Sequence, residues 1–228
     1  MNIDKTKNFW KDNLIYFIGI VLVLAVASYG LFAKLNKGDM LIFFSGHRTE
    51  WRNFYFRFMT YMGEGYVYVL AAIALLFVKF RYSLAVVINS LLVLATSVPL
   101  KNYFQHERPF TYFTNVLKEP DLVNYVEGVV LHTSWTSSFP SGHTTSAFAF
   151  YSLLAFLSPS KWGKILCLFL AINVALSRMY LVQHFLKDVT AGALTGVFVA
   201  LLTYYIQDRY KGRDWADRAL PIRRIEQP

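Results

Sequence analysis

Three short clusters of polar residues contain the side-chain types needed to bind a phosphate group and to attack its phosphorus atom. They supply three cations, two histidines, one carboxylate and a Ser-Gly pair, at Lys101, Arg108, Ser141, Gly142, His143, Arg178, His184 and Asp188. Catalysis of phosphoryl transfer consists mainly of positioning groups and stabilising the charge on the phosphoryl oxygens. We therefore expect Lys101, Arg108 and Arg178 to contact these oxygens, each arginine through its planar guanidinium group.

The middle cluster, Pro140 to His143, directly precedes a long apolar run and is predicted to begin a helix. The free N–H groups at a helix N-terminus bind anions, and Gly142 lets the backbone approach such an anion closely. The Ser141 hydroxyl adds a further donor. Taken alone, however, this segment would be interpreted as an ordinary N-cap formed by Ser141.

The last cluster places His184 and Asp188 four residues apart, so that they share one face of a predicted helix. A carboxylate bound to one ring nitrogen fixes the tautomer and leaves the other nitrogen free to attack phosphorus. A His–Asp pair on its own is more often a structural hydrogen bond. His143 is then available to protonate the leaving oxygen. A zinc site formed by His143, His184 and Asp188 is the alternative, but the three nearby cations would repel a metal. We therefore expect neither a metal nor another cofactor.

The remainder of the chain, which must position these clusters, is unusually apolar. Of its 228 residues, 55% are hydrophobic and only 16% are charged, well below the roughly 25% of charged residues in a soluble domain. A helix that spans a bilayer needs about 20 apolar residues. We expect a single domain, 1–228, with an all-α, polytopic membrane fold and six transmembrane helices near residues 14–33, 58–78, 82–100, 144–160, 162–178 and 189–207.

The distribution of positive charge favours a membrane partner and indicates an orientation. The formal net charge is +9, but many cations flank the apolar runs, as expected for contacts with anionic lipid headgroups rather than with nucleic acid. Lysine and arginine gather in segments 5–11, 79–81 and 161–164 and after residue 207. By the positive-inside rule both termini are cytoplasmic, and all three clusters then lie at outer helix ends.

In this order and at helix ends, the three clusters resemble the motifs of the type 2 phosphatidic acid phosphatase family, which includes bacterial phosphatidylglycerophosphatase B and undecaprenyl pyrophosphate phosphatase. The resemblance implies the helical core shared with acid phosphatases and vanadium haloperoxidases. It also implies that His184 forms a phosphohistidine, that Asp188 supports it, and that His143 is the general acid. The phosphate would be held by Lys101, Arg108, Ser141, Gly142 and Arg178, and the reaction would need no metal.

We therefore expect a multi-pass enzyme of the plasma (inner) membrane that removes a phosphate or pyrophosphate from a lipid at the outer leaflet. Candidate substrates are undecaprenyl pyrophosphate, phosphatidylglycerophosphate, phosphatidate and lipid A phosphates, and no obligate protein partner is evident. Two alternatives remain at this point. One is a phosphotransferase that passes the phosphoryl group to a second lipid, and the other is a non-catalytic membrane protein that kept the fold.

One further residue, Glu64, interrupts an apolar run near the expected outer surface. An ionisable group in such a place is a candidate functional residue. A charge at a helix end, in the lipid headgroup layer, is an equally good interpretation.

Overall fold

The structure, a computed structural model, describes residues 3–32, 35–131 and 137–221, and every regular element in these ranges is a helix. The longer elements are α1 (Ile3–Asp12), α2 (Leu14–Phe32), α3 (Asp39–Gly46), α4 (Glu50–Tyr61), α5 (Gly65–Leu76), α6 (Phe80–Phe104), α8 (Gly142–Leu157), α9 (Lys161–Tyr180) and α10 (Leu186–Asp208). The shorter ones are α7 (Pro109–Thr111), a π-helical turn η1 (Tyr112–Val116), a 3₁₀ turn η2 (Pro120–Leu122) and α11 (Asp214–Asp217).

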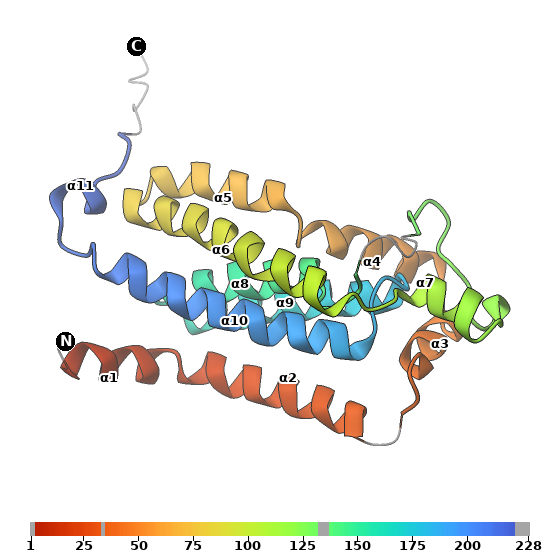
Figure 1. The fold of residues 1–228 in the computed structure, drawn as a ribbon. Helices are drawn as coiled ribbons and strands as arrows, with labels where there is room; N and C mark the ends of the chain where they lie inside the picture. The colour runs from red at the N-terminus through yellow and green to blue at the C-terminus, as the bar shows by residue number, and fades with distance from the viewer. Residues whose placement is uncertain (1–2, 33–34, 132–136, 222–228) are drawn as a thin grey trace, which may run out of the picture.

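The long helices lie side by side in one bundle, with α1 and α11 at one end and α3 and α7 at the other (Figure 1). Helix α8 is the centre of this bundle, because it packs against α6, α9 and α10 and buries most of its length. Its sequence explains this position. Apolar and small residues occur all round α8, and a helix without a polar face is stable only when other helices or lipid surround it.

Two glycines allow α10 to approach α8 at backbone distance. A Cβ atom added at Gly196 would lie 2.6 Å from the carbonyl oxygen of Thr145, and one added at Gly192 would lie 2.8 Å from that of Ser141. Such small residues are typical of tightly packed membrane helices, where close backbone approach replaces the hydrophobic driving force. As a result, the first turns of α8 and α10 lie next to each other.

The expected all-helical, multi-pass membrane fold is confirmed, but the expected six spans are not. Four stretches are long and apolar enough to cross a bilayer, namely Leu14–Phe32, Phe80–Val116, Lys161–Tyr180 and Leu186–Asp208. A fifth span is formed if α4 and α5 count as one helix bent by 57°. Helix α8, which contains most of the expected span 144–160, has 16 residues and is buried along most of its length. Residue 33, at the end of the first expected span, lies outside the described ranges.

We predict that Gly196→Ala destabilises the protein, because the new methyl group must displace the Thr145 carbonyl or separate α8 from α10. Overpacking of this kind costs about 1–3 kcal/mol. The measurement is thermal unfolding of the purified protein in detergent. Gly46→Ala is the matched control, since a Cβ atom there would meet nothing within 4 Å. Equal melting temperatures for the two variants would contradict the close packing.

Candidate active site

The three sequence clusters meet at the α3–α7 end of the bundle, opposite the end that carries α1 and α11 (Figure 1). The predicted residues come from five segments: Lys101 from the last turn of α6, Arg108 from the segment before α7, Ser141, Gly142 and His143 from the start of α8, Arg178 from the end of α9, and His184 and Asp188 from the start of α10. All eight are therefore brought to one place, although 87 positions separate the first from the last.

An unusual turn between α9 and α10 places His184 beside Arg178. The Gln183 N–H donates to the Arg178 carbonyl (2.9 Å) and the Val182 N–H to the Met179 carbonyl (3.0 Å), which is the pattern of a Schellman helix ending. The His184 N–H also donates to the Arg178 carbonyl, at 3.2 Å. Val182 takes the left-handed position with φ 56°, where glycine is the usual residue. Its side chain is buried in a cluster with Leu41 and Phe185, and this packing holds a backbone conformation that valine disfavours.

The imidazole of His184 has one nitrogen with its lone pair available. Its Nδ1 atom lies 2.8 Å from the carbonyl oxygen of Ser138, and because a carbonyl only accepts, Nδ1 must carry the hydrogen. The Nε2 atom is therefore unprotonated in the neutral ring. Burial, together with the positive charges of Arg178 and Arg108, holds the pKa of His184 well below its ordinary value. The ring is thus neutral at neutral pH and presents a nucleophilic nitrogen.

Asp188 acts on His184 through Ser138 and not through the direct hydrogen bond expected from the sequence. One oxygen of the fully buried Asp188 carboxylate accepts hydrogen bonds from the Ser138 hydroxyl and from the Phe185 N–H. The same oxygen lies 3.7 Å from His184 Nδ1, which is longer than a hydrogen bond. Ser138 was missed by the sequence analysis, and its only signal is its place two residues before Pro140.

The N-terminus of α8 is arranged to receive an anion. Ser141 is the N-cap residue, but its side chain makes no capping hydrogen bond and instead accepts the Thr144 hydroxyl at 2.9 Å. The first N–H groups of a helix lack partners within the helix. A Cβ atom added at Gly142 would lie 3.5 Å from Lys101 Nζ, so this ammonium group reaches the same helix end. Ser141 therefore occupies the N-cap position without the side-chain capping hydrogen bond of an ordinary N-cap.

Both arginines of the site are buried, and a buried cation is favoured by a negative charge beside it. One Arg178 nitrogen, Nη1, donates to the Thr60 hydroxyl, while Nε is buried and has no hydrogen-bond partner in the part of the chain that the structure describes. Arg108 Nη1 lies 3.4 Å from the carbonyl oxygen of Gln183. A phosphate between these side chains, Lys101 and the α8 N-terminus would compensate the buried charge.

The chain turns at Gln105 before it reaches Arg108. Gln105 takes a left-handed conformation with φ 44° at the end of α6. Pro109 begins α7, a position that suits its fixed φ angle and missing N–H.

Two hollows meet at His143. A polar one of about 230 Å³ is lined by residues that include Thr60, Glu64, Arg178 and Gln183. The other, of about 340 Å³, lies between α5, α6 and α8 and contains Lys101 and His143 next to Val93, Leu94 and Val98. In this junction His143 Nε2 lies 2.7 Å from Glu64 Oε1. The site therefore opens both to a polar space and to an apolar groove.

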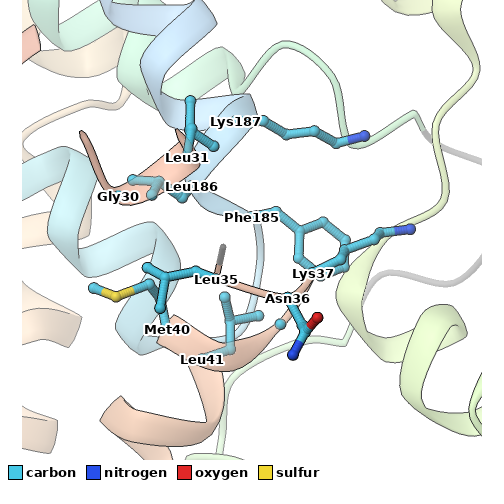
Figure 2. A pocket seen from close by; sticks show the side chains of 11 residues that line it. Gly30, Leu31, Leu35, Asn36, Lys37, Met40, Leu41, Phe185, Leu186 and Lys187 are labelled. Carbon is cyan, nitrogen blue, oxygen red and sulfur yellow. The ribbon is translucent and has the colours of Figure 1, made fainter. Parts of the chain in front are cut away.

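A separate pocket of about 170 Å³ lies at the end of α2, between α3 and the start of α10. Figure 2 shows Lys37 and Lys187 extending to one side of it, past Phe185, while leucine side chains fill the centre. None of the eight predicted residues lines this pocket. Within the described ranges, no group of three or more His, Cys, Asp or Glu side chains is placed to hold a metal ion.

Comparison with known proteins agrees with these features. Residues 66–211 match the PAP2 superfamily. The chain belongs to this superfamily. It is 27% identical to an undecaprenyl-diphosphatase of Sulfolobus acidocaldarius over 223 residues, which cover 93% of this chain and 96% of the relative. The family resemblance and the expectation of an enzyme of the lipid phosphatase class are thereby confirmed.

Two solved structures share the fold of this PAP2 protein. Aquifex aeolicus LpxE superposes with a TM-score of 0.63 at 23% identity, covering 75% of this chain and 97% of that one. A PAP2-type phosphatidylglycerolphosphate phosphatase of Bacillus subtilis gives a TM-score of 0.61 at 20% identity, covering 90% and 99%. At these identities the comparison supports the fold alone.

We predict that Ser138→Ala weakens both the fold and the reaction. Without the hydroxyl, the buried Asp188 carboxylate loses one of its two donors, which costs about 1–3 kcal/mol. Release of phosphate should fall about tenfold or more, because the hydroxyl no longer anchors to Asp188 the backbone carbonyl of Ser138 that holds the His184 ring. Phosphate release and the melting temperature in detergent are both measured.

The control is Thr195→Val, since the Thr195 hydroxyl bonds only the Ala191 carbonyl within α10. If Ser138→Ala matches this control in both measurements, the coupling of Asp188 to His184 through Ser138 is wrong.

Proposed function

We propose that this chain is a metal-independent lipid phosphate or diphosphate phosphatase that acts through a phosphohistidine on His184 at the outer leaflet. The observation that carries the proposal is the state of the His184 ring. Its Nδ1–H donates to the Ser138 carbonyl, so the Nε2 lone pair points away from that hydrogen bond. The positive charges of Arg178, Arg108 and Lys101 lie around the ring. A neutral imidazole among positive charges suits attack on an anionic phosphoryl group.

In the proposed reaction, His184 Nε2 forms a bond to phosphorus while the bond from phosphorus to the leaving oxygen breaks. His143 transfers its proton to that oxygen, and the lipid product leaves. Lys101, Arg108, Arg178 and the α8 N-terminus stabilise the charge on the equatorial oxygens. A water molecule then attacks phosphorus and gives a proton to His143, which releases phosphate and regenerates the neutral His184.

The apolar groove supports a lipid as the substrate. Its walls from α5 and α6 continue from Lys101 and His143 to Leu94 and Val98, whose side chains are exposed on the outside of the bundle. A chain in this groove could remain among apolar side chains and lipid, and each CH₂ kept out of water retains about 0.8 kcal/mol. We propose that the lipid reaches the site sideways through this groove, from the membrane.

The class of substrate is proposed from the same features together with the relatives. A protein that is similar over almost the whole length is named for a polyprenyl diphosphate, and a structural neighbour for phosphatidylglycerolphosphate. Both are lipids with a terminal phosphoryl group, which His184 can attack in the same way. Release of phosphate from a panel of defined lipids by the purified protein would identify the preferred one.

A phosphotransferase would form the same phosphohistidine in its first step. In the second step it would transfer the phosphoryl group to another lipid and not to water. Product analysis with an added lipid acceptor separates the two reactions, since a transferase yields a new lipid phosphate in place of free phosphate. A non-catalytic role is disfavoured, because every residue of the three motifs is present and they come together at one site.

We predict that His184→Ala and His143→Ala each reduce phosphate release by at least about 100-fold, with EDTA present throughout. The reason is that the first variant lacks the nucleophile and the second lacks the proton donor. Phosphate is measured with a lipid substrate in detergent, and melting temperatures close to that of the wild type show that the variants are folded. If EDTA inhibits the wild type and added zinc restores its activity, the reaction depends on a metal and not on the three cations Lys101, Arg108 and Arg178.

We also predict that the site faces the outside of the cell and that both termini are cytoplasmic. In a Cys167→Ala background, Glu119→Cys, in the segment between η1 and η2 that follows α7, should react with a membrane-impermeant thiol reagent on intact cells. Lys161→Cys, at the other end of α9, should react only after the membrane is opened. Both positions are exposed in the structure, so access is not limited by burial. The opposite labelling pattern would place the site at the inner leaflet.

A further inference from the structure

Glu64 makes a direct contact with the proposed general acid. Its Oε1 atom lies 2.7 Å from Nε2 of His143, and both side chains are only partly exposed, at 42% and 28%. The two residues come from different elements, 79 positions apart in the sequence. Glu64 lies at the break between α4 and α5, whereas His143 lies in the first turn of α8.

The break between α4 and α5 is built to bring Glu64 to this place. Helix α4 ends at Tyr61, and the axis of α5 is bent from it by 57°. At Gly63 an added Cβ atom would lie 3.0 Å from the His143 carbonyl oxygen and 2.8 Å from Val174. Only a residue without a side chain therefore allows the break to approach the start of α8 so closely.

The carboxylate of Glu64 is not used for the usual purpose at its position. Glu64 is the N-cap residue of α5, but its side chain accepts no hydrogen bond from the first turn of that helix. It binds the imidazole of His143 instead. With Nε2 held in this way, Nδ1 is the nitrogen of His143 that has no hydrogen-bond partner in the described part of the chain.

The other charged groups that face His143 are cations. Burial of the ring is the largest effect and lowers the pKa of His143; Arg178 from α9 and Lys101 from α6 lower it further, and the contact with Glu64 opposes them. His184, which also lies nearby, is neutral. A general acid in this position would lose its proton too readily unless a negative charge balanced the two cations.

We propose that Glu64 is a positioning residue for the reaction: it holds Nε2–H of His143 and favours the protonated ring over the neutral one, so that Nδ1–H is directed to the leaving oxygen. This inference rests on the proposed role of His143 as the general acid. As the bond from phosphorus breaks, the Nδ1 proton passes to the leaving oxygen, and the neutral ring remains bound to the Glu64 carboxylate. The water of the second step returns a proton to Nδ1, while Glu64 stays ionised throughout.

The test is Glu64→Gln, which keeps a hydrogen-bond acceptor for Nε2 but removes the charge. Three substrates are compared: a lipid phosphate, phenyl phosphate and 4-nitrophenyl phosphate. The leaving group of phenyl phosphate is about as basic as the tyrosine side chain, with a pKa of about 10. The leaving group of 4-nitrophenyl phosphate is far more acidic. A poor leaving group needs the acid, whereas a good one departs without it. We expect kcat to fall about tenfold or more for phenyl phosphate and less than about twofold for 4-nitrophenyl phosphate.

The pH–rate profile gives a second readout. The acid must be protonated, so the rate falls as pH rises through its titration. Without the Glu64 charge the ring binds its proton less tightly, and the alkaline limb for phenyl phosphate should move to lower pH. Glu50→Gln is the matched control, because Glu50 is an exposed carboxylate at the start of α4, outside the machinery described above. It should leave the rates and the profile unchanged.

The results separate this inference from the proposed function. If Glu64→Gln slows all three substrates equally, or none of them, or leaves the alkaline limb in place, the role given to Glu64 is overturned. In the first case Glu64 is only a structural contact. His143→Ala is measured in parallel. If it retains normal activity on phenyl phosphate, the general acid itself is wrong. Loss of activity in His143→Ala beside a normal Glu64→Gln overturns only this inference.

Discussion

The buried contacts of Asp188 are the constraint on which the arrangement of the site depends. Its carboxylate accepts hydrogen bonds from the Ser138 hydroxyl and the Phe185 N–H, and its carbonyl oxygen accepts the Ser141 N–H at 3.0 Å. One residue thus joins the segment before α8, the turn before α10 and the start of α8. A fully buried carboxylate is tolerated only where such donors are present, so the three segments must assemble together. The Nδ1–H of His184 is fixed on one of them, at the Ser138 carbonyl.

Cations surround the proposed nucleophile. Burial, and then the positive charges of Arg178, Arg108 and Lys101, disfavour a positive charge on the His184 ring. The same cations that would hold a phosphate therefore keep the proposed nucleophile neutral and reactive. Glu64, at the mouth of the apolar groove, supplies negative charge at the one place where a proton has to be retained. Burial and nearby cations lower the pKa of both histidines, and at His143 the Glu64 carboxylate opposes that effect.

Much of the fold could be read from composition, because the bilayer admits few solutions. Long apolar runs in a chain with few charges predict helices, since every backbone hydrogen bond in lipid must be satisfied within the segment. The number of spans could not be obtained in this way. Helix α8 is as apolar as a span but is surrounded by protein, and an apolar sequence does not reveal whether lipid or other helices cover it.

For the site, the sequence by itself determined which side chains are available and that they lie at helix ends. Residue type and spacing carry that information. The tertiary structure decided how they are joined. Ser138 stands between Asp188 and His184, Val182 takes a left-handed conformation that packing holds, and Glu64 reaches His143 across a break in another helix. Each of these features requires contact between segments that are distant in the sequence. The conformational preferences of neighbouring residues do not encode such contacts, which stabilise the protein only after the bundle has formed.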